Sequence, residues 1–270
     1  MCVYIIDVDA FAHEFAHDVY VCGDGESSGS FPWCTGVSDS GMIRIVHESS
    51  LTLLENSVVT GEINTECLTG VTECTNFGEL RIKKDGLLVI SGSGGLIRTL
   101  GAPLRITAHT DCDGDGEECS ADLRIDGDTP GSEATSMTVM SDNHDLEITI
   151  KLNNRGDVLA AGDDTTLYLK NARKDGNSGY WRASEGMLKV DKEVRGAGTW
   201  RTEGTDGIIQ FDDECLQLSG SFHIPLGWII FNEDGCTTGH MFFGEPDSLN
   251  ETAFAKVKAG HKATFHGDCE

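Results

Sequence analysis

The chain has 270 residues and carries 45 acidic against 20 basic residues, a formal net charge of −25 at pH 7. A surface this negative repels phosphate backbones, which excludes nucleic acid as a partner, and no apolar run reaches the roughly 18 residues of a membrane span. The acidity fits an extracellular protein, a cation-binding protein or a protein from a salty habitat, unless it serves solubility alone. The 33 glycines and 5 prolines favour many tight turns between short strands.

Residues 1–75 do not follow the regular pattern of the chain that comes after them. Residues 3–21 read either as a helix or as a long strand, and residues 42–75 contain short apolar segments at irregular spacing. We therefore expect residues 1–75 to form an irregular N-terminal cap and the first strands.

The segment His13-Glu14-Phe15-Ala16-His17 resembles the zinc-binding motif of zincin metalloproteases. On a helix, two histidines four residues apart share a face and could hold zinc, with Glu14 as the general base. Only twelve residues precede the motif, and no downstream helix offers a third ligand. We expect His13 and His17 to be packed or solvated side chains of the cap, with a zinc site or a zinc metalloprotease as the alternative.

In the central residues 76–232, a short triplet recurs about every 21 residues. Most triplets have an apolar residue at the first and third positions and a polar residue between them. Alternation places the two apolar side chains on one face of a strand. Because one such unit cannot bury its apolar face alone, a fixed period of 20–25 residues indicates stacked strand-like rungs. The sequence thus predicts an all-β fold, a β-solenoid with rungs of about 21 residues. The triplets begin at Leu80, Leu104, Leu123, Leu146, Leu167, Leu188, Ile208 and Trp228.

Three stretches, at residues 196–202, 207–211 and 218–222, resemble rungs of secreted parallel β-helix proteins and autotransporter passengers. The resemblance extends over about 150 residues and implies a β-solenoid fold, while it says nothing specific about activity. Residues 233–270 leave the period. We expect them to form a C-terminal cap, since an open end of the ladder would recruit another chain.

An acidic segment in the centre of the chain has the spacing of a calcium-binding loop. Calcium takes six to eight oxygen ligands, and carboxylates at loop positions 1, 3 and 5 converge on one point. The segment resembles the loops of EF-hand-like and thrombospondin-type repeats, but it has Asp at position 12 and two cysteines. The alternative is an acidic turn closed by a disulfide. The candidate ligands are Asp111, Asp113, Asp115, Glu117 and Asp122.

Ten cysteines in turn-rich segments favour disulfides made in an oxidising compartment. Since the run Val3–Ile6 is too short for a signal peptide, we expect that an export signal was removed or left out. The alternative is a set of buried reduced thiols. The local pairs are Cys22 with Cys34, Cys67 with Cys74, Cys112 with Cys119, and Cys215 with Cys236, which leaves Cys2 and Cys269.

Three arginines, Arg81, Arg105 and Arg124, occupy the middle of successive triplets and could form an outward stripe that grips a carboxylated glycan. The alternative is a solvated face on which charges pair across strands. No P-loop, dinucleotide-binding fingerprint or nucleophile elbow occurs in the sequence.

The sequence favours a structural function over an enzymatic one. We expect an extracellular, disulfide-stabilised protein of a cell surface, wall, sheath or filament that self-assembles from copies of itself, with calcium as a possible ligand. The alternatives are a carbohydrate-active β-helix enzyme, a module that binds surface glycans, and the zinc metalloprotease.

Overall fold

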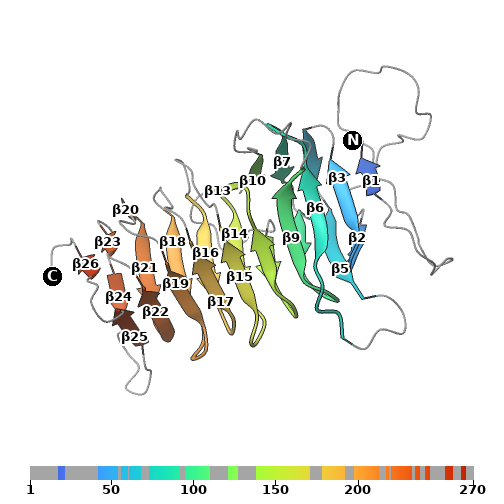
Figure 1. Ribbon diagram of the computed structural model, residues 1–270. Coiled ribbons are helices and arrows are strands. Elements are labelled where there is room, and N and C mark those ends of the chain that lie inside the picture. Colours follow the sequence, from blue (N-terminus) through green and yellow to red (C-terminus); the bar gives the residue numbers. More distant parts are fainter. Residues whose placement is uncertain are drawn as a thin grey trace.

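The computed structural model describes residues 18–21, 42–53, 56–59, 61–67, 73–91, 95–109, 121–126, 138–170, 178–191, 198–212, 217–218, 220–232, 235–237, 241–243, 253–257 and 263–265. These residues form strands and turns, and none of them lies in a helix. No helix that is long and apolar enough to span a membrane occurs in this part of the chain. The strands lie side by side along the length of the molecule, from the N-terminal to the C-terminal end (Figure 1).

The largest sheet has ten parallel strands, which neighbour one another in chain order. They are β1 (Asp18–Val21), β3 (Ser50–Leu53), β6 (Gly78–Ile82), β9 (Leu104–Ala108), β12 (Leu146–Ile148), β15 (Thr166–Leu169), β17 (Met187–Val190), β19 (Ile208–Phe211), β22 (Gly227–Phe231) and β25 (Ala253–Val257).

A second parallel sheet has nine strands, again in chain order. They are β2 (Met42–Val46), β5 (Glu62–Glu66), β8 (Leu96–Arg98), β11 (Thr138–Ser141), β14 (Asp157–Ala160), β16 (Tyr180–Ala183), β18 (Thr199–Thr202), β21 (Ser221–Ile224) and β24 (Met241–Phe243).

Two smaller parallel sheets complete the described structure. The four-stranded sheet contains β4 (Ser57–Val59), β7 (Leu87–Ile90), β10 (Asp122–Ile125) and β13 (Lys151–Asn154). The three-stranded sheet contains β20 (Gln217–Leu218), β23 (Gly235–Thr237) and β26 (Ala263–Phe265).

The core forms because the apolar positions of neighbouring strands lie in register. Leu167 is the register partner of Leu188, which in turn lies beside Ile209 of the next strand. All three side chains are fully buried, whereas the residues between the apolar positions are only half-buried. A period of two with one buried face is the pattern of a sheet that covers a core on one side only.

Stacked aromatic rings fill the core between the later strands. Trp200 lies between Trp181 and Phe222, with ring centroids 4.9 Å and 6.0 Å apart and planes 8° from parallel in both pairs. Phe211 of the ten-stranded sheet meets the edge of Trp200 at 5.1 Å. The aromatic contacts therefore join the two large sheets across the core.

A glycine begins β22 because the backbones of two neighbouring turns approach closely there. Gly227 has a φ of 77°, and a Cβ at this position would lie 2.3 Å from the carbonyl oxygen of Gly207. Neither condition suits a residue with a side chain.

The expected β-solenoid with rungs of about 21 residues is wrong. Leu104 and Leu146 are register partners in the ten-stranded sheet although 42 residues separate them. The triplet at Leu123 lies instead in the four-stranded sheet, between β7 and β13. The strands are divided among four parallel sheets, because an apolar-x-apolar triplet marks any half-buried strand and does not specify which sheet the strand joins.

Strands also occur within the two segments that were expected to form the ends, and the expected bounds of these segments stay predictions. Within residues 1–75, β2, β3 and β5 belong to the two large sheets, and so do β24 and β25 within residues 233–270. The strands within residues 42–75 agree with the first strands expected there from short apolar segments at irregular spacing.

The aromatic stack predicts that Trp200→Ala lowers the free energy of unfolding by about 3–5 kcal/mol, because a fully buried ring with three aromatic neighbours would leave a cavity. Denaturant unfolding followed by circular dichroism measures the loss. Trp228→Ala is the matched control, since Trp228 is only half-buried on β22, and an equal loss in both variants would contradict the prediction.

Candidate functional site

A groove of about 400 Å³ crosses the outer face of the ten-stranded sheet over β12, β15, β17 and β19. Its floor consists of the side chains that alternate with the buried apolar positions of these strands. The lining residues are Phe77, Asp145, Leu146, Glu147, Thr166, Tyr168, Met187, Lys189 and Gln210.

The charged side chains around the groove pair with one another across strands. Arg105 Nε lies 3.2 Å from Glu147 Oε1, and Lys170 Nζ lies 2.8 Å from the same oxygen. Farther along the sheet, Lys189 Nζ lies 2.9 Å from Asp212 Oδ2. Each of these cations thus has a carboxylate partner on another strand or the turn that follows it.

Tyr168 lines the groove and is fixed by its neighbours. The ammonium groups of Lys170 and Lys189 lie 5.1 Å and 4.8 Å from its ring centroid, within the range of cation–π attraction. Its hydroxyl donates a 3.0 Å hydrogen bond to Asp191 Oδ2. Burial and the contact with Asp191 raise the pKa of Tyr168 to about 12, so at neutral pH the phenol is a hydrogen-bond donor and not a base.

Two carboxylates in or near the groove, Glu147 and Asp212, are held in the charged form. Burial acts to raise the pKa of Glu147, but hydrogen bonds from Lys170 and Arg105 outweigh it, and the pKa lies below its ordinary value. The pKa of Asp212 is lowered in the same way, because hydrogen bonds from Lys189, Asn232 and Gln210 outweigh burial. Carboxylates with lowered pKa values are poor general acids at neutral pH, so Glu147 and Asp212 act here as charged partners of the neighbouring cations.

The outer face of the nine-stranded sheet has its own ion-pair network. Arg182 Nε donates a 2.8 Å hydrogen bond to Asp157 Oδ1, and Arg182 Nη1 lies 3.2 Å from Glu203 Oε1. The hydrogen bond that Arg182 donates to Asp157 raises the pKa of Arg182. Since Asp157 is 2% exposed, this network holds β14, β16 and the end of β18 together.

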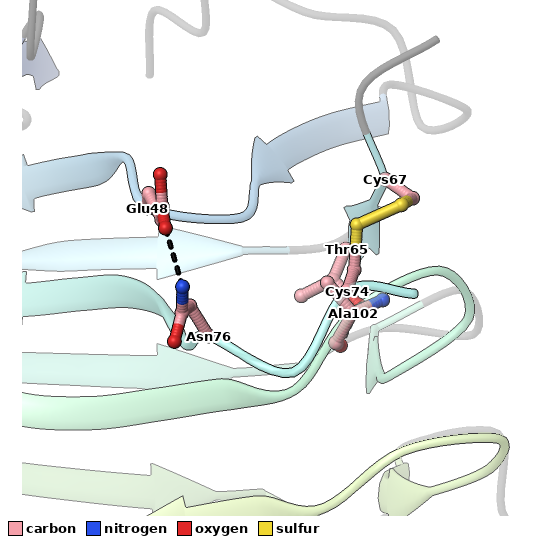
Figure 2. Close-up of a disulfide and its surroundings, with 6 residues drawn as sticks. All are labelled: Glu48, Thr65, Cys67, Cys74, Asn76 and Ala102. Atoms are coloured by element: carbon pink, nitrogen blue, oxygen red, sulfur yellow. Dashed lines mark hydrogen bonds between the residues drawn. A yellow bond between two sulfur atoms is a disulfide. The ribbon is translucent and has the colours of Figure 1, made fainter. Parts of the chain in front are cut away.

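A disulfide closes the loop that connects β5 to β6. It joins Cys67 and Cys74, whose Cα atoms are 5.8 Å apart. Figure 2 shows it beside Thr65 and Ala102, and Thr65 Oγ1 donates a 2.5 Å hydrogen bond to the carbonyl oxygen of Ala102. The nearly buried side chain of His47 brings an imidazole nitrogen to the two sulfurs, with all three atoms within 4.8 Å of one another.

Most of the metal-ligand candidates from the sequence lie outside the described residues. This holds for His13 and His17 and for four of the five carboxylates of the acidic loop, Asp111, Asp113, Asp115 and Glu117. The fifth, Asp122, is half-buried at the start of β10. Both metal sites therefore stay predictions.

The remaining expected disulfides also involve residues outside the described part of the chain. Cys236 is on β23, where its register partner is Gln217 of β20. The other seven are Cys2, Cys22, Cys34, Cys112, Cys119, Cys215 and Cys269.

The expected arginine stripe is not continuous. Arg81 and Arg105 lie on neighbouring strands, and both contact Glu79, at 2.8 Å and 3.6 Å. Arg124 lies on β10 of another sheet and pairs with Asp126 at 2.8 Å. Cross-strand and local ion pairing is thus the alternative that the structure favours for these arginines.

Sequence reasoning missed the groove, although a signal for it exists. Its central residues Glu147, Tyr168 and Lys189 occupy the middle positions of three consecutive triplets, which are register partners. Reading the middle positions as a column would have placed them side by side.

No family model matches the chain, and neither a curated protein nor a solved structure matches it. The resemblance of residues 196–222 to secreted parallel β-helix proteins therefore stays a prediction.

Glu147→Gln is expected to lower the free energy of unfolding by roughly 1–3 kcal/mol near neutral pH, because its hydrogen bonds come from two charged groups. The pKa of Glu147 is below its ordinary value of 4.5. The stabilisation is therefore complete above pH 4.5 and is lost as the pH falls through the folded-state pKa.

Urea unfolding of the wild type and Glu147→Gln over a pH series measures this difference. Glu185→Gln is the control, since Glu185 is exposed in a turn and should show no comparable gap. If the free energies of unfolding of the wild type and Glu147→Gln still differ by the same amount at pH 2, the stabilisation does not come from the charged form of Glu147.

Proposed function

We propose that this chain is an extracellular structural protein of a cell surface, wall, sheath or filament, and that it assembles end to end with copies of itself. The observation that carries the proposal is the arrangement of its two large sheets. Every strand in them is parallel to its neighbours, and the strands follow one another in chain order.

The two ends of this arrangement are complementary. In the part of the chain that the structure describes, β1 and β25 are the outer strands of the ten-stranded sheet, and β2 and β24 are those of the nine-stranded sheet. Outer strands present unpaired backbone groups. Since all strands run in one direction, the first strands of one copy can continue the sheets of another copy, and a head-to-tail joint that does not close on itself produces a filament.

Two further features support the proposal. The disulfide between Cys67 and Cys74 is typical of proteins made in an oxidising compartment. The net charge of −25 opposes lateral aggregation of copies. Calcium at the acidic loop 111–122 would reduce this repulsion and could bridge two subunits.

The proposal predicts that Ala255→Pro weakens end-to-end association by about fivefold or more. Ala255 is exposed on the outer strand β25. Trp228 N donates to Gly207 O, so Trp228 points its backbone groups to β19 and the next residue, Ile229, points its backbone groups to β25. In a parallel pair, the register partner of such a residue points its own backbone groups away from it. Because Ala255 is the partner of Ile229, the N–H of Ala255 lies at the outer edge of the sheet. Proline removes that donor and obstructs pairing. Sedimentation velocity over a concentration series measures the association.

Thr205→Pro provides the matched control. Thr205 is the second residue of the turn in which Gly207 N donates to Gly204 O, a position that accepts proline. It should associate as the wild type does. A wild-type chain that stays monomeric at every concentration and salt level, with no filaments in electron micrographs, would overturn the proposal.

The groove favours a second candidate function, the binding of a neutral surface glycan. It combines two aromatic side chains, Phe77 and Tyr168, with polar groups such as Asp145 and Gln210, the mixture expected of a small-molecule site. The paired carboxylates described above favour binding over cleavage. A strongly acidic glycan would be repelled by the chain's own charge.

Tyr168→Ala should weaken the binding of a neutral oligosaccharide by about tenfold or more, because it removes an aromatic side chain that lines the groove. Calorimetric titration with a panel of neutral and acidic oligosaccharides measures this. Tyr180→Ala is the control, since Tyr180 is half-buried on the nine-stranded sheet. Absence of binding to the whole panel, or an equal loss in both variants, would remove this candidate.

A further inference from the structure

Beside the two sulfur atoms of the disulfide lies a third potential metal ligand, an imidazole nitrogen of His47. His47 directly follows β2, and Cys67 directly follows β5. The two strands pair in register, Val46 with Glu66, and His47 N donates a 3.1 Å hydrogen bond to Glu66 O. The parallel ladder therefore places His47 and Cys67 side by side, and Cys74 approaches from the segment before β6.

The positions of these residues are fixed by contacts that do not involve the sulfur atoms. Thr65 Oγ1 bonds to the carbonyl oxygen of Ala102, and Ala102 N donates back to Thr65 Oγ1 at 3.2 Å. On the other side, the Asn76 amide donates to the Glu48 carboxylate (Figure 2), and Glu48 N donates to Phe77 O at 3.2 Å. The segments that hold His47, Cys67 and Cys74 are thus anchored whether or not the disulfide is closed.

We propose that the reduced form of this cluster is a zinc site formed by His47, Cys67 and Cys74. Two thiolates and an imidazole are preferred ligands of Zn²⁺, with bonds of about 2.3 Å and 2.0–2.1 Å. At tetrahedral angles these bonds place donors roughly 3.4–3.8 Å apart. Because all three donor atoms already lie within 4.8 Å of one another, small side-chain movements suffice to bind the ion.

The burial of the cluster strengthens this assignment. His47 is 8% exposed and Cys74 is 5% exposed, so bulk water has little access to two of the three donors, whereas Cys67 is half-buried and offers a path for the ion. Three protein ligands leave the fourth zinc position to a water molecule.

The conversion of the disulfide to the zinc-bound form is balanced in atoms and electrons. A thiol or phosphine reductant supplies two electrons, two protons enter, and the Cys67–Cys74 bond opens to two thiols. Zinc binding then releases the two thiol protons to solvent while two Zn–S bonds and one Zn–N bond form. The same loop is closed by a covalent bond under oxidising conditions and by the metal under reducing conditions.

The test uses the full chain after reduction with a phosphine. Zinc affinity and stoichiometry are measured by competition with a chromophoric chelator, and Co²⁺ serves as a spectroscopic replacement whose thiolate charge-transfer absorption reports sulfur ligation. His47→Ala and Cys67→Ser should each lose one tight zinc equivalent, a weakening of at least about a hundredfold, since loss of outer-shell partners alone costs 10–100-fold. His223→Ala, a half-buried histidine of β21, should bind as the wild type does.

A second variant covers the case in which reduction unfolds the chain. Cys67→His cannot form the disulfide but keeps three donors, so it should bind one zinc ion without reductant, and the added change His47→Ala should abolish this binding. The proposal is overturned if His47→Ala leaves zinc stoichiometry and affinity unchanged in both backgrounds.

Discussion

The parallel backbone ladder is the constraint on which the rest of the structure depends. In the ten-stranded sheet, Met187 N donates to Thr165 O at 2.8 Å, and Ile208 N donates to Gly186 O at 3.1 Å. These bonds fix each strand in register with the one before it. A residue therefore has as its neighbours the residues at the same position of the preceding and following strands, and the whole core is built from columns of like side chains.

The same constraint acts on the outer faces, where like charges in one column would repel. Arg105 accordingly lies between Glu79 and Glu147, and Tyr168 lies between Glu147 and Lys189 in the same column. The groove is thus a consequence of register, because it forms where the outward column changes from charged to aromatic side chains. Register also brings His47 of one strand end to Cys67 of the next.

Local structure was predictable to a much greater extent than sheet membership. The triplets at Leu80, Leu104 and Leu123 all lie in strands, because alternation of apolar residues is a property of a few neighbouring residues. The third of these joins a different sheet, which depends on the length and path of the connections. The groove and the cysteine cluster unite residues about 20 positions apart, so neither can be recognised until the pairing of strands is known.

In the proposed assembly, pairing of the outer strands and the acidity of the chain act against each other. The outer strands β1 and β2 have four and five residues, and the strands β25 and β24 that they would join have five and three. The shorter strand of each pair limits the joint to roughly seven backbone hydrogen bonds of about 1 kcal/mol net each. Association costs an estimated 4–15 kcal/mol, which nearly cancels this gain. On this proposal the outcome depends on the repulsion between copies of charge −25. Since the Debye length is about 10 Å at 0.1 M salt, added salt or bound divalent cations would favour the joining of chains.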